Sequence, residues 1–150
     1  MSGMKFREIK ENKKQFLSLL LLADEQENMI DRYLEKGTMY VLDDNGVKAE
    51  CVVTDEGDGI LEIKNIATVP EYQGKGYAKA LIDFLVNEYA YKYSVLQVGT
   101  GDSPLTVPFY EKCGFVRSHI IPNFFTNNYD HPIFECGVKL TDMVIFQRNL

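Results

Sequence analysis

A short loop at residues 73–78 has residue types and spacing suited to binding an anion. Gly74 and Gly76 allow backbone N–H groups to approach a ligand closely, because glycine has no side chain to obstruct them. The apolar spacing of the residues that follow predicts a helix, and the first N–H groups of a helix have no partner inside it. The helix dipole favours negative charge at this end, and Lys75 and Lys79 add positive charge. We therefore predict a site for a phosphate or pyrophosphate group.

Two familiar phosphate-binding loops do not fit this stretch. The P-loop requires Lys and then Ser or Thr after its second glycine, whereas Tyr77 and Ala78 follow Gly76. The dinucleotide-binding fingerprint requires a third glycine at the position of Lys79. The loop instead fits the pattern Gln/Arg-x-x-Gly-x-Gly/Ala, with Gln73, Gly76 and Ala78 at the defined positions. It thereby resembles the acetyl-CoA pyrophosphate loop of the GNAT N-acetyltransferase superfamily, although alone it would also suit a glycine-rich turn between a strand and a helix.

A second motif supports the resemblance. The run Phe109-Tyr-Glu-Lys-Cys-Gly-Phe115 is similar to the F-Y-x-x-x-G-F signature that ends the fourth helix of GNAT proteins. The two motifs follow one another in the order typical of that family, and the chain is identified as a member on this basis. The resemblance implies an N-acetyltransferase that moves the acetyl group of acetyl-CoA to a primary amine by direct attack in a ternary complex.

That reaction requires both a base and an acid. An alkylammonium has a pKa of roughly 10 and must lose a proton before it attacks a thioester. The thiolate that leaves is the conjugate base of a thiol with a pKa near ~8.5, by analogy with cysteine. Each proton transfer is worth roughly 10²–10⁴ in rate when a side chain is positioned for it. The oxyanion formed between the two steps needs a hydrogen-bond donor, typically a backbone N–H.

The resemblance assigns candidates to both roles. Tyr110 matches the tyrosine that protonates the thioester sulfur in the family, although it would also serve as an aromatic packing residue. Glu62 matches the strand position where some members carry a catalytic glutamate, and its alternative is an ion-paired strand residue. Glu135 and Asp142 are rival bases near the last hairpin, and water is another.

The resemblance also places the cofactor. The backbone around Ile66, Ala67 and Val69 is expected to contact the pantetheine arm and the acetyl group, which would pair with the strand as an added strand. A splay between this strand and the next would make room for the arm. The pyrophosphate is expected on the loop and the first helical turn, at Gln73, Gly74, Lys75, Gly76, Tyr77, Ala78 and Lys79.

One position departs from the family pattern. Many members carry Asn just after the fifth strand, where it contacts the cofactor arm, but here Asp102 stands at that position. An ionised carboxylate cannot donate a hydrogen bond. The adjacent Ser103 is the candidate for this contact.

The elements expected around these residues make a single α/β (α+β) domain over residues 1–150. Periodicity and turn residues predict strands at 4–9, 38–42, 47–54, 60–69, 94–98, 115–121 and 138–148. Helices are expected after Asn12 and Asp24 as N-caps, from the loop to about Tyr91, and from Ser103 to Gly114, with a long loop over 122–137. The GNAT resemblance implies a mixed, mostly antiparallel twisted sheet of about seven strands with helices on both faces.

Composition limits the partners. The net charge of −6 disfavours nucleic acid, because phosphate contacts need clustered Lys and Arg. The apolar run 16–23 is too short to cross a bilayer. Three separated cysteines without a C-x-x-C, and two isolated histidines, His119 and His131, indicate no metal and a cytoplasmic protein.

Several alternatives stay open at the level of sequence. The acceptor amine is either a small molecule or a protein amino group, and a homodimer is one of the assemblies to expect, since many members of the family form dimers. An enzyme that uses a longer acyl-CoA is a further reading. A non-catalytic acyl-CoA-binding sensor would also need the 73–78 loop, but it would not need Tyr110 or a base.

Overall fold

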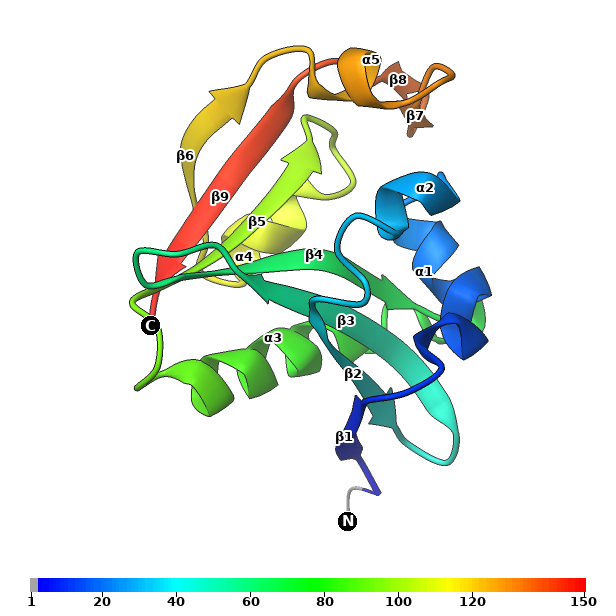
Figure 1. The fold of residues 1–150 in the computed structure, drawn as a ribbon, viewed down its shortest axis with the longest axis vertical. Helices are drawn as coiled ribbons and strands as arrows, with labels where there is room; N and C mark the ends of the chain where they lie inside the picture. The colour runs from blue at the N-terminus through cyan, green and yellow to red at the C-terminus, as the bar shows by residue number, and fades with distance from the viewer. Residues whose placement is uncertain (1–2) are drawn as a thin grey trace.

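A seven-stranded sheet organises the computed structural model, which describes residues 3–150. The strands run in the order β1-β2-β3-β4-β5-β9-β6, and only the β4–β5 pair is parallel (Figure 1). Their bounds are β1 Lys5–Ile9, β2 Thr38–Asp43, β3 Val47–Asp55, β4 Ile60–Thr68, β5 Val95–Gly101, β6 Val116–Ile121 and β9 Met143–Asn149. The predicted fold class, a mixed and mostly antiparallel sheet of seven strands, is confirmed.

Helices cover both faces of this sheet, as predicted (Figure 1). The long helix α3, Tyr77–Tyr89, packs Leu81, Ile82 and Leu85 into the larger core. The short helices α1, Leu17–Ala23, and α2, Glu27–Ile30, cover the opposite face with a second core. The remaining helices are α4, Val107–Lys112, and α5, Phe124–Asn128, together with the 3-10 turns η1, Lys13–Phe16, and η2, Pro70–Tyr72.

Strands β4 and β5 pair along only part of their length. The pairing runs from Ile60 with Val95 to Ile63 with Val98, and both strands continue beyond it without pairing to each other. The cause lies on the other side of β4, where Val53 pairs with Ile63 but Val52 pairs with Asn65. Lys64 is therefore the extra residue of a β-bulge, and a bulge bends its strand. The two strands diverge past this point, which confirms the splay expected from the resemblance.

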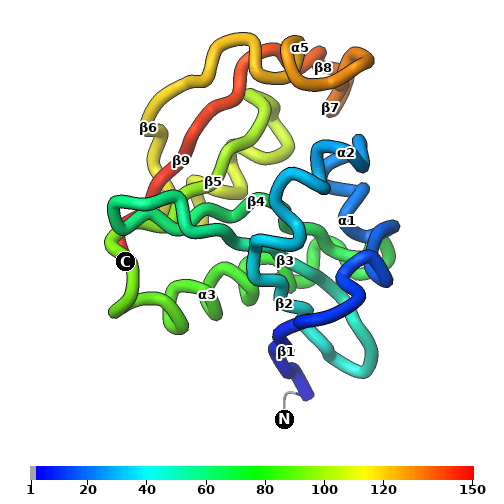
Figure 2. The backbone as a smooth tube through the Cα atoms, viewed as in Figure 1, coloured from blue at the N-terminus to red at the C-terminus, as the bar shows by residue number. Residues whose placement is uncertain are grey.

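The segment between β6 and β9 is more structured than the sequence suggested. It contains α5 and a hairpin of β7, Phe134–Glu135, with β8, Val138–Lys139, and its own small core of Phe125, Ile133 and Leu140. The single strand predicted over 138–148 is therefore wrong. Leu140 turns inward into the small core and interrupts the strand, so that β9 starts at Met143. We call residues 122–140 the roof segment. It faces α1 and α2 on the side of the molecule where β4 and β5 diverge (Figure 2).

Three predicted helix starts are also corrected. Asn12 precedes η1 without a side-chain cap, and α2 follows Gln26 instead of Asp24, whose carboxylate bonds to tyrosine hydroxyls. Helix α4 begins at Val107 instead of after Ser103, because Pro108 suits the first turn of a helix. Among the described residues, no helix is long and apolar enough to cross a membrane, and no group of His, Cys, Asp and Glu is arranged to hold a metal ion.

Candidate active site

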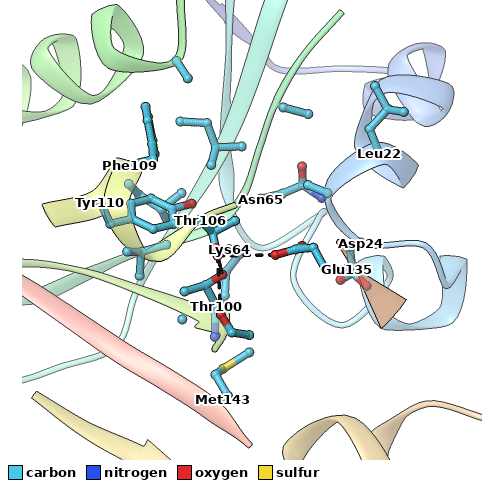
Figure 3. A pocket seen from close by; sticks show the side chains of 18 of the residues that line it. Leu22, Asp24, Lys64, Asn65, Thr100, Thr106, Phe109, Tyr110, Glu135 and Met143 are labelled. Atoms are coloured by element: carbon cyan, nitrogen blue, oxygen red, sulfur yellow. Dashed lines mark hydrogen bonds between the residues drawn. The ribbon is translucent and has the colours of Figure 1, made fainter. Parts of the chain in front are cut away.

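A cleft of about 1010 Å³ opens where β4 and β5 diverge. Its walls come from the end of α1, the second half of β4, the loop before α3, the end of β5, helix α4 and the roof segment. Both sequence motifs therefore reach one continuous space. Figure 3 shows the Tyr110 hydroxyl and the Glu135 carboxylate turned toward this space from α4 and from β7.

The predicted anion-binding loop lies at one end of the cleft. Gly74 and Gly76 adopt φ values of 78° and 86°, which L side chains rarely adopt, so glycine is required for the backbone turn. The first helical hydrogen bond runs from the Ala80 N–H to the Gly76 carbonyl at 3.0 Å. Within the described chain, the N–H groups of residues 77–79 find no acceptor. This arrangement fits an anion.

The side chains around the loop are placed unequally. Gln73, Tyr77 and Lys79 line the cleft together with Gly74, Gly76 and Ala78, whereas Lys75 is not among the lining residues. Lys79 forms an ion pair with Asp83 at 2.8 Å, while the Lys75 ammonium lies 5.6 Å from the centre of the Tyr72 ring. The loop therefore offers mainly backbone N–H groups, with lysine charge nearby.

The strand predicted to hold the cofactor arm has a free edge. Ile66 and Ala67 line the cleft on the part of β4 that no longer pairs with β5. Backbone groups on such an edge can pair with an extended ligand. Val69 is different, because its N–H donates to the Lys48 carbonyl at 2.8 Å and the residue is not part of the cleft lining.

Tyr110 combines a packed ring with a hydroxyl at the cleft. Its ring is 6% exposed and lies with its centroid 5.8 Å from that of Phe115 and 6.1 Å from that of Phe146. None of the described residues hydrogen-bonds to the hydroxyl. Burial, followed by the nearby Cys113 and Glu135, raises the pKa of Tyr110 well above its ordinary value. The side chain is therefore a neutral phenol that keeps its proton.

Glu62 lies in the same cleft, and each of its two carboxylate oxygens has a side-chain partner. Lys64 Nζ lies 2.7 Å from Glu62 Oε2, and Gln97 Nε2 donates to Glu62 Oε1 at 2.6 Å. Gln97 is itself fixed, since its side-chain oxygen accepts from Gln147 Nε2 at 2.7 Å. Lys64 stands two residues after Glu62 on β4, where side chains share one face of a strand, so the candidate base is also an ion-paired strand residue.

The rival bases occupy different places. Glu135 lines the cleft and accepts hydrogen bonds from Ser103 Oγ and, at 3.4 Å, from Thr106 Oγ1. Asp142 lies outside the cleft lining and accepts the Asn123 N–H at 2.8 Å. The structure therefore brings Glu62 and Glu135 together with Tyr110 in one cleft and leaves Asp142 apart.

The position after β5 is also outside the cleft. Asp102 points to solvent, with its carboxylate 3.3 Å from Arg117 Nη2. Ser103 is buried, and its hydroxyl donates a hydrogen bond to the Glu135 carboxylate. Neither side chain lines the cleft, and the cofactor contacts expected of both stay predictions.

Sequence reasoning missed a second carboxylate site at Asp24. Asp24 lines the cleft and accepts a hydrogen bond from Tyr33 at 2.9 Å and one from Tyr129 at 2.6 Å. Burial raises the pKa of Asp24, opposed by these two hydroxyls. Tyr33 is held in turn by Asn65 Nδ2 at 3.0 Å. Asp24 and Tyr129 are 105 residues apart in the chain, so only the fold reveals the site.

Comparisons with known proteins agree with this geometry. The profile of the acetyltransferase (GNAT) domain family matches residues 35–117. The uncharacterized N-acetyltransferase YvbK of Bacillus subtilis (strain 168) is 34% identical over 137 residues, which cover 89% of this chain and 88% of that protein.

Two solved structures resemble the whole chain. A GNAT family acetyltransferase from Elizabethkingia anophelis with acetyl-CoA bound has a TM-score of 0.93 and 31% identity, covering 100% of both chains. An IAA acetyltransferase from Bacillus cereus ATCC 14579 has a TM-score of 0.90 and 35% identity, covering 99% of this chain and 100% of that one. The family predicted from the two motifs is confirmed, and the chain belongs to the GNAT acetyltransferases.

Proposed function

We propose that this protein transfers the acetyl group of acetyl-CoA to a primary amine by direct attack, with both substrates bound in the one cleft. The observation that carries the proposal is the buried, neutral phenol of Tyr110 at the centre of a cleft that also holds the anion loop and the free β4 edge. A relative of the same fold has acetyl-CoA bound, which supports this cofactor.

The proposal gives each part of acetyl-CoA a place in the cleft by its chemical fit. The free N–H groups of residues 77–79 receive the pyrophosphate, and the lysines nearby add favourable charge. The pantetheine arm lies along the open edge of β4 at Ile66 and Ala67. This course directs the thioester toward α4, where Tyr110 lies.

In the proposed reaction, one bond forms and one bond breaks at the acetyl carbon. The amine nitrogen forms a bond to the acetyl carbonyl carbon, and the carbon–sulfur bond breaks. A proton leaves the amine for a carboxylate of the cleft, for which Glu62 and Glu135 are both positioned, or for water. Tyr110 gives its proton to the departing thiolate. The products are an N-acetylated amine and free coenzyme A.

Tyr110 suits the acid role because of its surroundings. A thiolate that forms in a cleft with apolar walls is poorly solvated, so a proton donor stabilises it. Since burial raises the pKa of Tyr110, its proton is present at the start of each turnover across the neutral and mildly alkaline range. After the transfer, solvent or the base side of the cleft restores the proton.

The decisive experiment measures CoA thiol release from acetyl-CoA with a panel of primary amines, beside a reaction without amine. The proposal expects release that depends on the amine, with N-acetylated product in equal amount. Thiol release that is the same with and without amine would reduce the activity to thioester hydrolysis. Binding of acetyl-CoA with no release at all would favour the acyl-CoA-binding sensor. Cytoplasmic location and a homodimer stay predictions.

A further inference from the structure

The path proposed for acetyl-CoA, along the anion loop and β4 to α4, leaves the other half of the cleft free. This half lies between the α1–α2 connection and the roof segment, and we call it the acceptor half. Its walls are largely apolar and aromatic, and they include Leu22, Met29, Phe124, Phe125, Phe134 and Met143. The charged residues of this wall on the α1–α2 side are Asp24, Glu25, Arg32 and Lys36. Glu25 pairs with His131 and Arg32 donates to Asn128, whereas Asp24 is bonded to two tyrosine hydroxyls.

The Asp24 carboxylate is held but not neutralised. Its two oxygens accept hydrogen bonds from the Tyr33 and Tyr129 hydroxyls, the Gln26 backbone N–H also supports the carboxylate, and the charge of Arg32 favours its ionised form. An ionised carboxylate has about four acceptor sites, so capacity remains for further donors. The nearby guanidinium of Arg32 donates to Asn128 Oδ1 at 3.0 Å, and no ion pair joins it to Asp24 among the described residues.

The surroundings make such a carboxylate receptive to a cation. Burial alone disfavours its charged form, and a positive partner would relieve that cost. Aromatic faces in the same walls are also favourable to a cation. Three other carboxylates of the cleft already have a basic partner, because Glu62 and Glu56 lie beside Lys64 and Glu25 lies beside His131. Glu135, like Asp24, accepts from hydroxyl groups, but it lies on the roof segment beside Ser103 and Thr106.

The frame around Asp24 is fixed before any ligand binds. Tyr129 joins Asp24 to the roof segment, and three further contacts join the same two walls. These are Gln26 to the Asp130 N–H at 3.0 Å, Glu25 to His131 at 3.0 Å, and Arg32 to Asn128 at 3.0 Å. A site whose walls are already connected loses less entropy when a ligand binds.

We propose that the acceptor half selects a cationic amine with an apolar or aromatic body, and that Asp24 is the specificity-determining residue that pairs with its ammonium group. This inference rests on the proposed function, because it names the acceptor class for the same cleft. The ammonium lies against the carboxylate, and the body lies among the aromatic walls. An acceptor that carries its own carboxylate is disfavoured, since it would face Asp24.

The test measures binding instead of turnover, so that it does not depend on catalysis. Protein saturated with CoA is titrated with 2-phenylethylamine, with the neutral isostere 2-phenylethanol, and with phenylalanine. A charge-assisted hydrogen bond is the stronger kind, so we expect the amine to bind about tenfold or more tightly than the alcohol. Phenylalanine is expected to bind more weakly than the amine.

Three variants separate a charge role from a structural one. Asp24→Asn keeps the shape and can still bond to both tyrosines, but it should remove the preference for the amine over the alcohol. Tyr129→Phe keeps the charge and loses one link to the roof, so the ratio of the two affinities should persist. Asp31→Asn changes the same charge on an exposed carboxylate that pairs with Lys14, and the ratio should stay unchanged.

The outcomes distinguish this inference from the proposed function. An amine preference that is lost in Asp24→Asn, with no acetylated product from any amine, would support the amine site and overturn the acetyl transfer. Acetylation of amines with an equal preference in wild type and Asp24→Asn would keep the transfer and overturn the role of Asp24. Equal binding of amine and alcohol by the wild type, or equal loss of both ligands in Asp24→Asn and Tyr129→Phe, would also overturn it.

Discussion

Replacing Tyr110 by Phe removes one oxygen atom from the centre of the proposed mechanism. The ring contacts with Phe115 and Phe146 are apolar and remain in the variant. Since no described residue hydrogen-bonds to the hydroxyl, its loss leaves no protein group without a partner. We therefore expect the free energy of unfolding to change by less than about 0.5 kcal/mol, as for substitutions that create no cavity or unpaired group.

The catalytic effect should be much larger than the effect on stability. General acid catalysis contributes roughly 10²–10⁴ in rate when the acid is well matched to its task. Burial raises the pKa of Tyr110, so the phenol is a weaker acid than a free tyrosine and the gain is at the lower end. We expect turnover to fall by roughly 10- to 100-fold. Because the hydroxyl takes no part in the ground-state pyrophosphate contacts, the dissociation constant of CoA should change by less than about twofold.

The assay compares turnover with an active amine and the CoA dissociation constant by titration calorimetry for both proteins. It is repeated between about pH 7 and pH 9.5, below the ordinary Tyr pKa of about 10. A raised pKa means that Tyr110 stays protonated over this range, so its titration should produce no alkaline loss of wild-type activity. Full activity in Tyr110→Phe would refute the acid role and make the residue a packing residue. If CoA affinity fell in Tyr110→Phe by as much as turnover, the conclusion that the Tyr110 hydroxyl does not contribute to CoA binding would be refuted.

Three further substitutions test other parts of the molecule. Gly76→Asp adds a carboxylate at the free N–H groups and a side chain at φ 86°, so CoA affinity should fall by about tenfold or more in calorimetry. Gly57→Asp has a similar φ of 84° in a distant turn and controls for backbone strain, and equal losses in both variants would contradict the anion site. Glu62→Gln should lower turnover at neutral pH and recover part of it at high pH, where the amine loses its proton unaided, whereas a loss that is constant with pH would move the base role to Glu135 or water. Glu50 is fully buried, and its carboxylate oxygens have no partner of normal hydrogen-bond geometry among the described residues. Burial, which the Ala67 N–H opposes only in part, raises its pKa well above the ordinary value. The folded state then binds more protons than the unfolded state above about pH 4.3, so wild-type stability falls as pH rises. Glu50→Gln should therefore gain stability relative to wild type between pH 5 and pH 8 in guanidinium unfolding, and a difference that is independent of pH would contradict the raised pKa.

The parts predictable from sequence are those encoded by local patterns. The loop at 73–78 and the motif at 109–115 identify the family because backbone conformation and helix termination depend on residues close together in the chain. The turn residues at 44–46 and 55–59, which bound β3 and β4, predict these strands for the same reason. Gly76 and Tyr110 consequently appear where the two motifs place them.

The parts that sequence did not predict depend on contacts between distant residues. Asp24 resembles a helix cap in the sequence, and only the fold brings Tyr129 against it. The bulge at Lys64 arises from the register of β3 against β4, which no local pattern in the sequence encodes. The break in the strand before β9 depends on Leu140, which packs with Phe125 and Ile133 in the small core of the roof segment.

The most direct test of acetyl transfer follows an isotopically labelled acetyl group from acetyl-CoA. The protein is incubated with the labelled cofactor and each amine of the panel in turn, 2-phenylethylamine among them, and the products are separated and identified by mass spectrometry. Acetyl transfer predicts labelled N-acetyl-2-phenylethylamine and free CoA in equal amounts, with much less of both in Tyr110→Phe. Labelled acetate without acetylated amine, or cofactor that is bound but unchanged across the whole panel of amines, would contradict it.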